Sequence, residues 1–296
     1  MRVKLILRDI IEELRSIKAF IIVFCVSIIL LVSVTSMFYS IANSNQNGYA
    51  TNYKAVLYMY NNLIFIEFMI VVVIIPLIAG TSYSKEYKDG TLDLLLLSKV
   101  QTIDFLLSKI MRCLIFNILL VSISLPMLCV VFSVGGVSLW DIIKFFIVIA
   151  ITTLFFSCIG IYFSVRFKAG NRAILCTYAV EGILIFGTTF IFNIIYNIFD
   201  KVKNRAFYNG VSGAEYEKIQ FEFLGNLLVG NPIFNLYKLQ SDIVGKTSKF
   251  DITMNNFGIN LVVNKIWIFI SISLQLFVVF WLIRKIKKIM FVRHSK

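Results

Sequence analysis

Two acidic residues lie inside long apolar stretches of this sequence, where a carboxyl group could bind a cation. Glu67 lies in the stretch 61–80. Glu181 lies about eight residues into the stretch 173–199, or ~12 Å along a helix. A carboxyl group inside a membrane is costly, and it usually faces water or the interior of a helix bundle. We therefore expect these two residues either to line a substrate path or to hydrogen-bond an Asn, Ser or Tyr of a neighbouring helix.

The other reactive residue types form no catalytic or metal-binding pattern. Five cysteines lie in apolar stretches or at their edges: Cys25, Cys113, Cys129, Cys158 and Cys176. No CxxC pair occurs, so these are expected to be small buried hydrophobic residues. The single histidine, His294, lies in a basic tail. Gly245-Lys246-Thr247 is no Walker A loop, because that motif needs a glycine where the chain has Gln240. We expect no catalytic residue, metal site or nucleotide site in this chain.

The overall composition indicates a membrane protein. Of the 296 residues, 59% are hydrophobic and 15% are charged. A soluble domain of this length has too little interior volume for so much apolar surface. Intrinsic disorder is excluded as well, because it requires low hydrophobicity. The net charge of +13 would fit nucleic-acid binding, unless the basic residues serve to orient membrane spans.

Six stretches are long and apolar enough to cross a hydrocarbon core of roughly 30 Å. They lie near 19–41, 61–80, 110–134, 142–165, 173–199 and 265–283. The predicted fold is an all-α membrane protein, with a six-span transmembrane domain over residues 19–296 and a separate N-terminal helix over residues 1–18.

The positions of the basic residues predict the orientation of the spans. Five precede the first span, five lie between the second span and the first turns of the third, three link the fourth and fifth, and six follow the sixth. The opposite side holds fewer, and the long loop 200–262 is nearly neutral. Cytoplasmic loops are enriched in Lys and Arg, so we expect both termini in the cytoplasm of a cell (plasma) membrane protein. This distribution argues against a nucleic-acid partner.

The N-terminal residues 1–18 predict an amphipathic helix. Apolar residues recur there at helical spacing: Val3, Ile6, Ile10, Leu14 and Ile17. Basic residues beside an apolar stripe favour a helix lying in the cytoplasmic membrane interface. The alternative is a simple cytoplasmic extension of the first span.

One stretch of the long loop, 223–239, is half apolar but is interrupted by Gly225, Gly230 and Pro232. It is too broken to span the membrane. It fits either a re-entrant or interfacial element packed on the spans or an ordinary membrane-proximal loop.

The segment 84–109 carries the most informative pattern of the chain. A charged stretch precedes four consecutive leucines at 94–97, which would cover every face of a short helix. Ser98 could end this helix, and Thr102 could cap the next one. The run is too short to span the membrane, so we expect it to dock on another protein. The alternative, packing only against its own spans, would bury one stripe and not four consecutive leucines.

This segment resembles the region after the second span in permease subunits of type-2 ABC transporters, where the pattern begins E-x-x-x-G-T-L-[ED]-L-L-L. The matching residues are Glu86, Gly90, Thr91, Leu92, Asp93, Leu94, Leu95, Leu96, Val100, Asp104, Phe105 and Lys109. The chain departs from the pattern at Lys99, Thr102 and Ser108, where the family usually has Pro, Arg and Gly. The six-span plan and the N-terminal helix extend the resemblance to nearly the whole chain.

In that family the segment is the coupling helix, which sits in a cleft of a separate ATP-binding subunit. The resemblance implies ATPase-coupling roles for Glu86, Gly90, Thr91, Leu92, Asp93, Leu94, Leu95 and Leu96. It implies as partners an ABC ATPase subunit, a second permease (identical or paralogous) and membrane lipid. ATP and Mg would bind to the ATPase, so the chain itself would be no enzyme and would hold no cofactor.

The resemblance also implies an exporter whose substrate path lies at the permease–permease interface, around the second and fifth spans that carry Glu67 and Glu181. An amphipathic peptide, an antibiotic or a lipid-like molecule would suit such a path.

The main alternative is a secondary transporter or channel subunit that uses the two carboxyls as a cation relay. The spans lack the paired Gly/Pro-broken helices expected of inverted repeats, which argues against it. The chain also lacks HExxH and a paired intramembrane Asp, which argues against an intramembrane protease.

Overall fold

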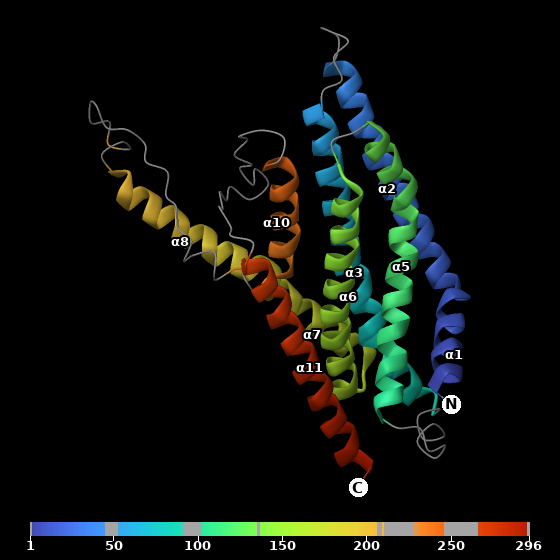
Figure 1. Cartoon of the computed structure of the whole chain (residues 1–296). Helices are drawn as coiled ribbons and strands as arrows, with labels where there is room; N and C mark the ends of the chain where they lie inside the picture. The colour runs from blue at the N-terminus through green and yellow to red at the C-terminus, as the bar shows by residue number, and fades with distance from the viewer. Residues whose placement is uncertain are drawn as a thin grey trace. The chain divides into compact units, whose positions relative to one another are not determined.

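The computed structural model describes residues 2–44, 53–90, 102–134, 137–205, 209, 228, 230–245 and 266–294. Within these residues the regular structure is helical, and no strand occurs. The helices follow one another as drawn in Figure 1: α1 (Arg2–Leu14), α2 (Ile17–Ser44), α3 (Tyr53–Lys88), α5 (Thr102–Val134), α6 (Leu139–Phe167), α7 (Gly170–Gly182), the π-helical turn η2 (Ile183–Gly187), α8 (Thr188–Lys203), α10 (Pro232–Gly245) and α11 (Ile266–His294).

Six helical stretches are long and apolar enough to cross a membrane. They are Ile17–Tyr39, Met59–Lys88, Thr102–Phe132, Leu139–Phe167, Gly170–Lys203 and Ile268–Met290. Each predicted span falls on one of these stretches, which confirms an all-α, multi-pass membrane protein. The fifth stretch combines α7, η2 and α8.

The chain divides into two compact units. The first comprises Met1–Tyr178 and Leu276–Lys296, and the second comprises Ala179–Gln275. The first therefore holds α1 to α6, most of α7 and the later part of α11, whereas the second holds η2, α8 and α10.

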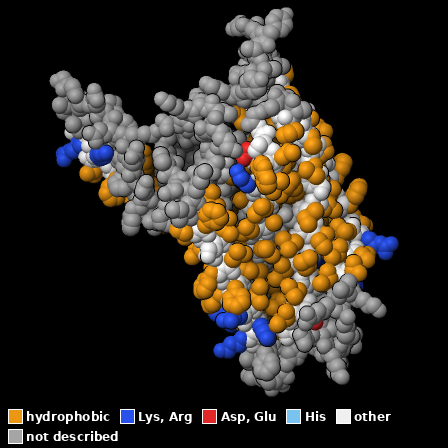
Figure 2. Space-filling model, in the orientation of Figure 1, with side chains coloured by type: hydrophobic (Ala, Val, Ile, Leu, Met, Phe, Trp, Pro, Cys, Tyr) orange, Lys and Arg blue, Asp and Glu red, His pale blue; other side chains and the backbone are white. Residues whose placement is uncertain are grey.

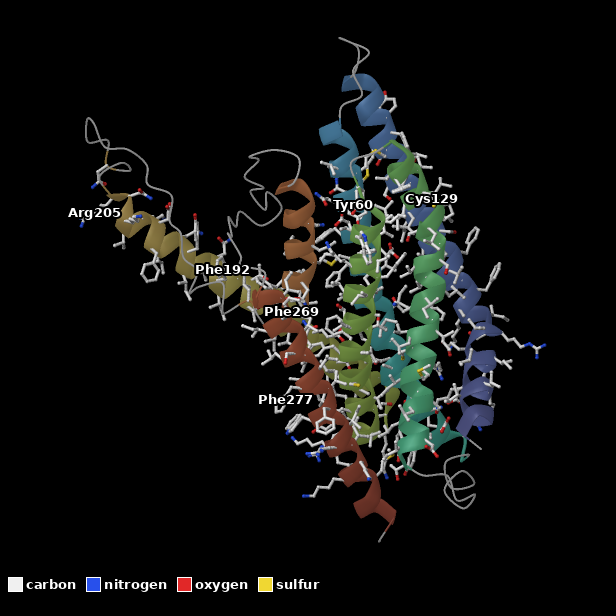
Figure 3. The ribbon with its side chains drawn as sticks, in the orientation of Figure 1. Tyr60, Cys129, Phe192, Arg205, Phe269 and Phe277 are labelled. Carbon is white, nitrogen blue, oxygen red and sulfur yellow. The ribbon has the colours of Figure 1, made fainter. Side chains whose placement is uncertain are left out.

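Helices α3 and α6 form the closest helix pair of the first unit, and they run in the same direction. The Tyr60 hydroxyl donates to the carbonyl of Asp141, and the Ser164 hydroxyl accepts from the backbone N–H of Tyr83 at 3.1 Å. Both contacts join residues 81 apart, so the two helices keep one register over most of their length. Tyr60 is labelled in Figure 3.

A glycine makes this close approach possible. A Cβ atom added at Gly160 of α6 would lie only 2.6 Å from the Cβ of Ala79 on α3. Such a distance is well inside van der Waals contact, so the backbones of α3 and α6 can meet here only because residue 160 has no side chain.

The outer helices expose large apolar side chains. On α2, Phe20, Phe24 and Leu31 are all more than half exposed. Figure 2 shows a broad hydrophobic face of this kind. Such a surface is untenable in water but suits contact with lipid acyl chains.

Helix α3 continues well past the predicted end of the second span. It runs to Lys88, so residues 84–88 of the segment 84–109 are helical and not part of a loop. Gly90 follows with a φ of +67°, a left-handed conformation that favours glycine and ends the helix. Residues 91–101 lie outside the described residues.

Candidate functional site

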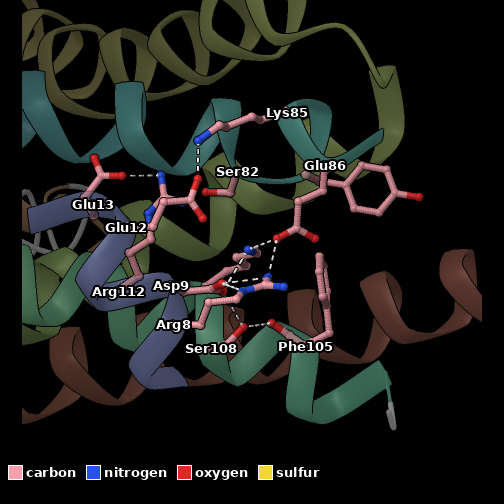
Figure 4. A network of polar contacts seen from close by, with 12 residues as sticks. Arg8, Asp9, Glu12, Glu13, Ser82, Lys85, Glu86, Phe105, Ser108 and Arg112 are labelled. Carbon is pink, nitrogen blue, oxygen red and sulfur yellow. Dashed lines mark hydrogen bonds and ion pairs between the residues drawn. The ribbon is translucent and has the colours of Figure 1, made fainter. Parts of the chain in front are cut away.

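Three buried charged residues meet where α1, α3 and α5 come together. The ammonium of Lys109 on α5 lies 2.8 Å from a carboxylate oxygen of Asp9 on α1 and also pairs with Glu86 of α3 (Figure 4). The Lys109 side chain is only 2% exposed. We call Asp9, Glu86 and Lys109, together with Arg8, the charge cluster. A buried lysine is tolerated only when carboxylates compensate its charge, and here two different helices supply them.

A second cation balances the charge cluster. The Arg8 guanidinium lies 2.9 Å from Asp9 and 3.3 Å from Glu86. The Ser108 hydroxyl donates a further hydrogen bond to Asp9 at 2.9 Å. Two carboxylates therefore face two cations, and the cluster is close to neutral as a whole. This neutrality explains how it can be buried at an end of the helix bundle.

The charge cluster changes the acidity of Asp9. Burial opposes ionisation of this carboxyl, but the charge of Lys109 and hydrogen bonds from Lys109, Arg8 and Ser108 hold its pKa below the usual range. The group contributes stability above its unfolded pKa and loses this contribution as the pH falls through its folded pKa.

Two further ion pairs attach α1 to the same helices. Glu12 pairs with Lys85 of α3, and Glu13 lies 2.9 Å from Arg112 of α5. The Glu12–Lys85 pair is half exposed and contributes little, whereas Arg112 is largely buried. The hydrogen bond from Lys85 lowers the pKa of Glu12.

These contacts fix the direction of α1. Asp9 meets Lys109 and Glu13 meets Arg112, so α1 runs alongside α5 in the same direction. The side chains of Leu7, Ile11 and Leu14 are about half exposed, whereas Asp9 is 1% exposed. Helix α1 is thus amphipathic, as expected, but its charged face turns toward the protein. Its location in the membrane interface remains a prediction.

The charge cluster lies beside the segment that was expected to couple to an ATPase. Of the predicted coupling residues, Glu86 belongs to the cluster, and Gly90 ends α3 four residues later. The other six (Thr91, Leu92, Asp93, Leu94, Leu95 and Leu96) lie outside the described residues. The ends of α3 and α5 that flank residues 91–101 are therefore joined by the pair of Glu86 and Lys109.

Glu67 occupies a very different place on α3. It is 1% exposed, and neither carboxylate oxygen has a hydrogen-bond partner among the described residues. The hydroxyl of Ser124 on α5 is close to this carboxyl, but it donates its hydrogen bond to the carbonyl of Val121 at 2.8 Å. The structure therefore buries this acid inside the first unit and does not bring it to a surface.

Glu181 belongs to the second unit, directly before the π-helical turn of the fifth span. It is 2% exposed, and in the described residues its carboxylate also has no hydrogen-bond partner. Glu181, Ile185 and Thr189 are spaced by about one turn, and all three are buried. They form one buried face of this span.

Asn231 inserts into that face at the π-helical turn. Its side-chain amide donates to the carbonyl of Ile185 at 3.0 Å and to the hydroxyls of Thr188 and Thr189 at 2.9 and 3.2 Å. Its side-chain oxygen accepts from the backbone N–H of Ile233 at 3.0 Å, which caps α10. π-Helical turns often occur at functional sites, because they alter the backbone hydrogen-bond ladder.

Helix α10 shows that the later part of the stretch 223–239 is helical and not an irregular loop. Pro232 stands at the first helical position, where a missing N–H costs nothing, so it starts a helix and does not break one. The helix buries Ile233, Phe234 and Leu236. Of the earlier part of this stretch, only residues 228, 230 and 231 are described.

The sequence reasoning named Lys109 as a match to the family pattern but missed Asp9, Asn231 and the pairing of Lys109 with Asp9. Asp9 and Lys109 are 100 residues apart, and the charges of the N-terminal helix were taken to face the membrane interface. The signal for Asn231 was present, because Asn-Pro before an apolar stretch is a helix start. The described residues bring together no three His, Cys, Asp or Glu side chains that could hold a metal ion.

No protein-family model and no curated protein matches this chain. Its class therefore follows from its own fold and side chains: it is a multi-pass α-helical membrane protein with a buried charge cluster at the junction of α1, α3 and α5.

Proposed function

We propose that this chain is the transmembrane permease subunit of an ATP-driven ABC exporter. The observation that carries the proposal is the segment 86–109, whose pattern resembles the coupling helix of such permeases and whose two flanking helices are joined by the buried ion pair of Glu86 and Lys109. The chain pairs with a second permease, identical or paralogous. A separate ATPase subunit binds ATP and Mg and docks on the cytoplasmic face.

The charge cluster gives this proposal a physical mechanism. A docked helix can move membrane spans only if the spans respond as a rigid body. Asp9, Glu86 and Lys109 bind three helices together directly beside the coupling segment. A displacement of residues 91–96 is therefore passed to α1, α3 and α5 together, and not absorbed by one helix end.

The substrate path of the proposed exporter involves Glu67 and Glu181, which would contact cationic groups of an amphipathic peptide, an antibiotic or a lipid-like molecule. Both carboxyls are buried, with Glu67 1% and Glu181 2% exposed. A substrate reaches them only after neighbouring helices part, which is what ATP-driven movement would supply.

The test is isolation of the full-length chain from its native membrane with any ATP-hydrolysing protein bound to it. We expect an ATPase to co-purify, and Glu86→Arg and Gly90→Pro to abolish transport-coupled ATP hydrolysis. Lys88→Glu, an exposed charge reversal on the last turn of α3, is the matched control and retains hydrolysis. Leu95→Glu distinguishes a loss of docking from a loss of folding. The ATPase should no longer co-purify with this variant, whereas its unfolding temperature should equal that of the wild type.

A secondary transporter or cation channel is the second candidate. It is favoured by one observation, namely that two membrane-embedded carboxyls, Glu67 and Glu181, have no hydrogen-bond partner among the described residues. Such groups mark ion pathways in many membrane proteins. Reconstitution of the chain alone decides this: transport driven by a proton gradient, with no ATPase present, would establish the second function and exclude the first.

A further inference from the structure

The end of α11 carries a group of basic side chains that the transport proposal does not use. Arg284, Lys285, Lys287 and Lys288 are all exposed, and they lie within two helical turns. No Asp or Glu occurs in the chain after Asp251. These four cations have no carboxylate partner among the described residues, unlike Arg8, Lys85, Lys109, Arg112 and Lys144.

Aromatic rings hold two of these cations in place. The Lys285 ammonium lies 4.0 Å from the ring centroid of Trp281 and 5.9 Å from that of Tyr162 on α6. The Arg284 guanidinium lies 4.3 Å from the ring centroid of Phe280. These contacts keep the two charges close to the helix surface, directly beside large apolar groups.

The same helix surface is apolar one turn earlier. Phe277, labelled in Figure 3, is 68% exposed, and Phe280 and Trp281 are about half exposed. In a membrane-spanning helix such side chains contact acyl chains, and Trp is enriched where acyl chains give way to headgroups. The four cations follow immediately after Trp281 in the helix, where we expect the lipid phosphates to lie. Figure 2 shows basic side chains at the lower border of the hydrophobic face.

We propose that this surface, formed by Trp281, Arg284, Lys285, Lys287 and Lys288, binds the phosphate headgroups of anionic phospholipids. Basic residues next to a membrane span attract anionic lipid, and the attraction acts over about a Debye length. A free soluble anion would not need the exposed Phe277, Phe280 and Trp281 beside the cations. A lipid uses both parts, because its phosphate meets the cations and its acyl chains meet the rings.

Trp281 itself reports the bound lipid. The full-length chain with Trp140→Phe and Trp267→Phe keeps Trp281 alone, and the chain with Trp281→Phe and Trp267→Phe keeps Trp140 alone. Each is placed in phosphatidylcholine vesicles that contain a fixed minor fraction of brominated phosphatidylglycerol or of brominated phosphatidylcholine. Bromine quenches tryptophan fluorescence on contact, so the ratio of quenching measures lipid preference.

Trp140 is a matched control at the start of α6. It is more exposed than Trp281, and the nearest charges, Asp141 and Lys144, neutralise each other. We expect brominated phosphatidylglycerol to be enriched about fivefold beside Trp281 and not beside Trp140, with the enrichment falling as salt is raised. Lys285→Gln with Lys288→Gln should abolish the preference at Trp281, whereas Lys18→Gln should leave it intact.

Two outcomes would overturn the proposal. Equal quenching of Trp281 by the two brominated lipids would show that these cations do not select anionic lipid. An equal preference at Trp140 and Trp281 would show a general surface charge and no site. Because the assay needs neither ATP nor an ATPase, its result is independent of the transport proposal.

Discussion

Two glutamates of the same helix, Glu67 and Glu86, show opposite ways of burying an acid. They lie roughly 28 Å apart along α3. Glu86 meets the cations Lys109 and Arg8, whereas Glu67 lies close to Ser124 and has no hydrogen-bond partner among the described residues. The difference separates two roles. A buried charge with fixed partners holds helices together, and a buried acid without them is available for a ligand or a proton.

The largest effect is expected from removing the cation at the centre of the charge cluster. Lys109→Met leaves the buried carboxylates Asp9 and Glu86 with Arg8 as the remaining cation of the charge cluster, and it should lower the free energy of unfolding by about 3–5 kcal/mol. Thermal unfolding of the purified full-length chain in detergent measures this loss.

The control for Lys109→Met is Lys144→Met, which removes a half-exposed lysine paired with Asp141 and should cost about 1 kcal/mol or less. Asp9→Asn combined with Lys109→Met should lose less than the sum of the single changes, because the two residues interact directly. Additive losses would contradict the charge cluster.

The direct comparison uses the same substitution at both glutamates. Glu86→Gln leaves two cations with a single carboxylate and should cost about 1–3 kcal/mol. Glu67→Gln removes an acid that has no cation partner among the described residues, so stability should be unchanged or higher. Thermal unfolding of the two variants in parallel measures both changes. Equal destabilisation would contradict the proposal that Glu86 stabilises the fold and Glu67 does not.

A smaller effect is expected at the end of α3. Gly90 has a φ of +67°, and no atom of the described residues lies within 4 Å of the position of an added Cβ. Gly90→Ala should therefore cost only backbone strain, about 1 kcal/mol. We expect faster hydrogen exchange of the backbone amides near Glu86 and an unchanged exchange rate of the amides around Glu67. Loss of protection throughout α3 would contradict this local role.

The smallest effect is the pH dependence that comes from Asp9. Its folded pKa is lowered, so it stabilises the fold above its unfolded pKa, and this contribution disappears as the pH falls through the folded pKa. The unfolding temperature of the wild type should therefore drop more steeply at acidic pH than that of Asp9→Asn. Parallel curves would show that Asp9 is not ionised in the folded protein.

The sequence predicted the membrane part of this fold well. Runs of about 20 apolar residues have almost no other stable arrangement, so all six spans were found. Their ends were less certain, because α3 continues through polar residues to Lys88 and only Gly90 marks its end. A hydropathy pattern does not contain this information.

The candidate site was predicted only in part. Glu86 and Lys109 were both identified from the pattern of the segment 84–109, but Asp9 comes from a distant part of the chain and meets Lys109 only through helix packing. The π-helical turn begins after Gly182 and ends at Gly187, but glycine is frequent in membrane spans and does not by itself predict a π-helix. The turn becomes recognisable through the hydrogen bond from Asn231 to the carbonyl of Ile185. Long-range side-chain pairing of this kind depends on the register of the helices, which a single sequence does not reveal.

We propose that the segment between α3 and α5 receives movement from an ATPase. The most direct measurement places a photo-crosslinking amino acid at position 95 of the full-length chain in its native membrane, with the same probe at position 138 as a control. We predict a crosslink to an ATP-hydrolysing protein from position 95 and none from position 138. Absence of that crosslink, together with transport by the purified chain alone under a proton gradient, would contradict the account.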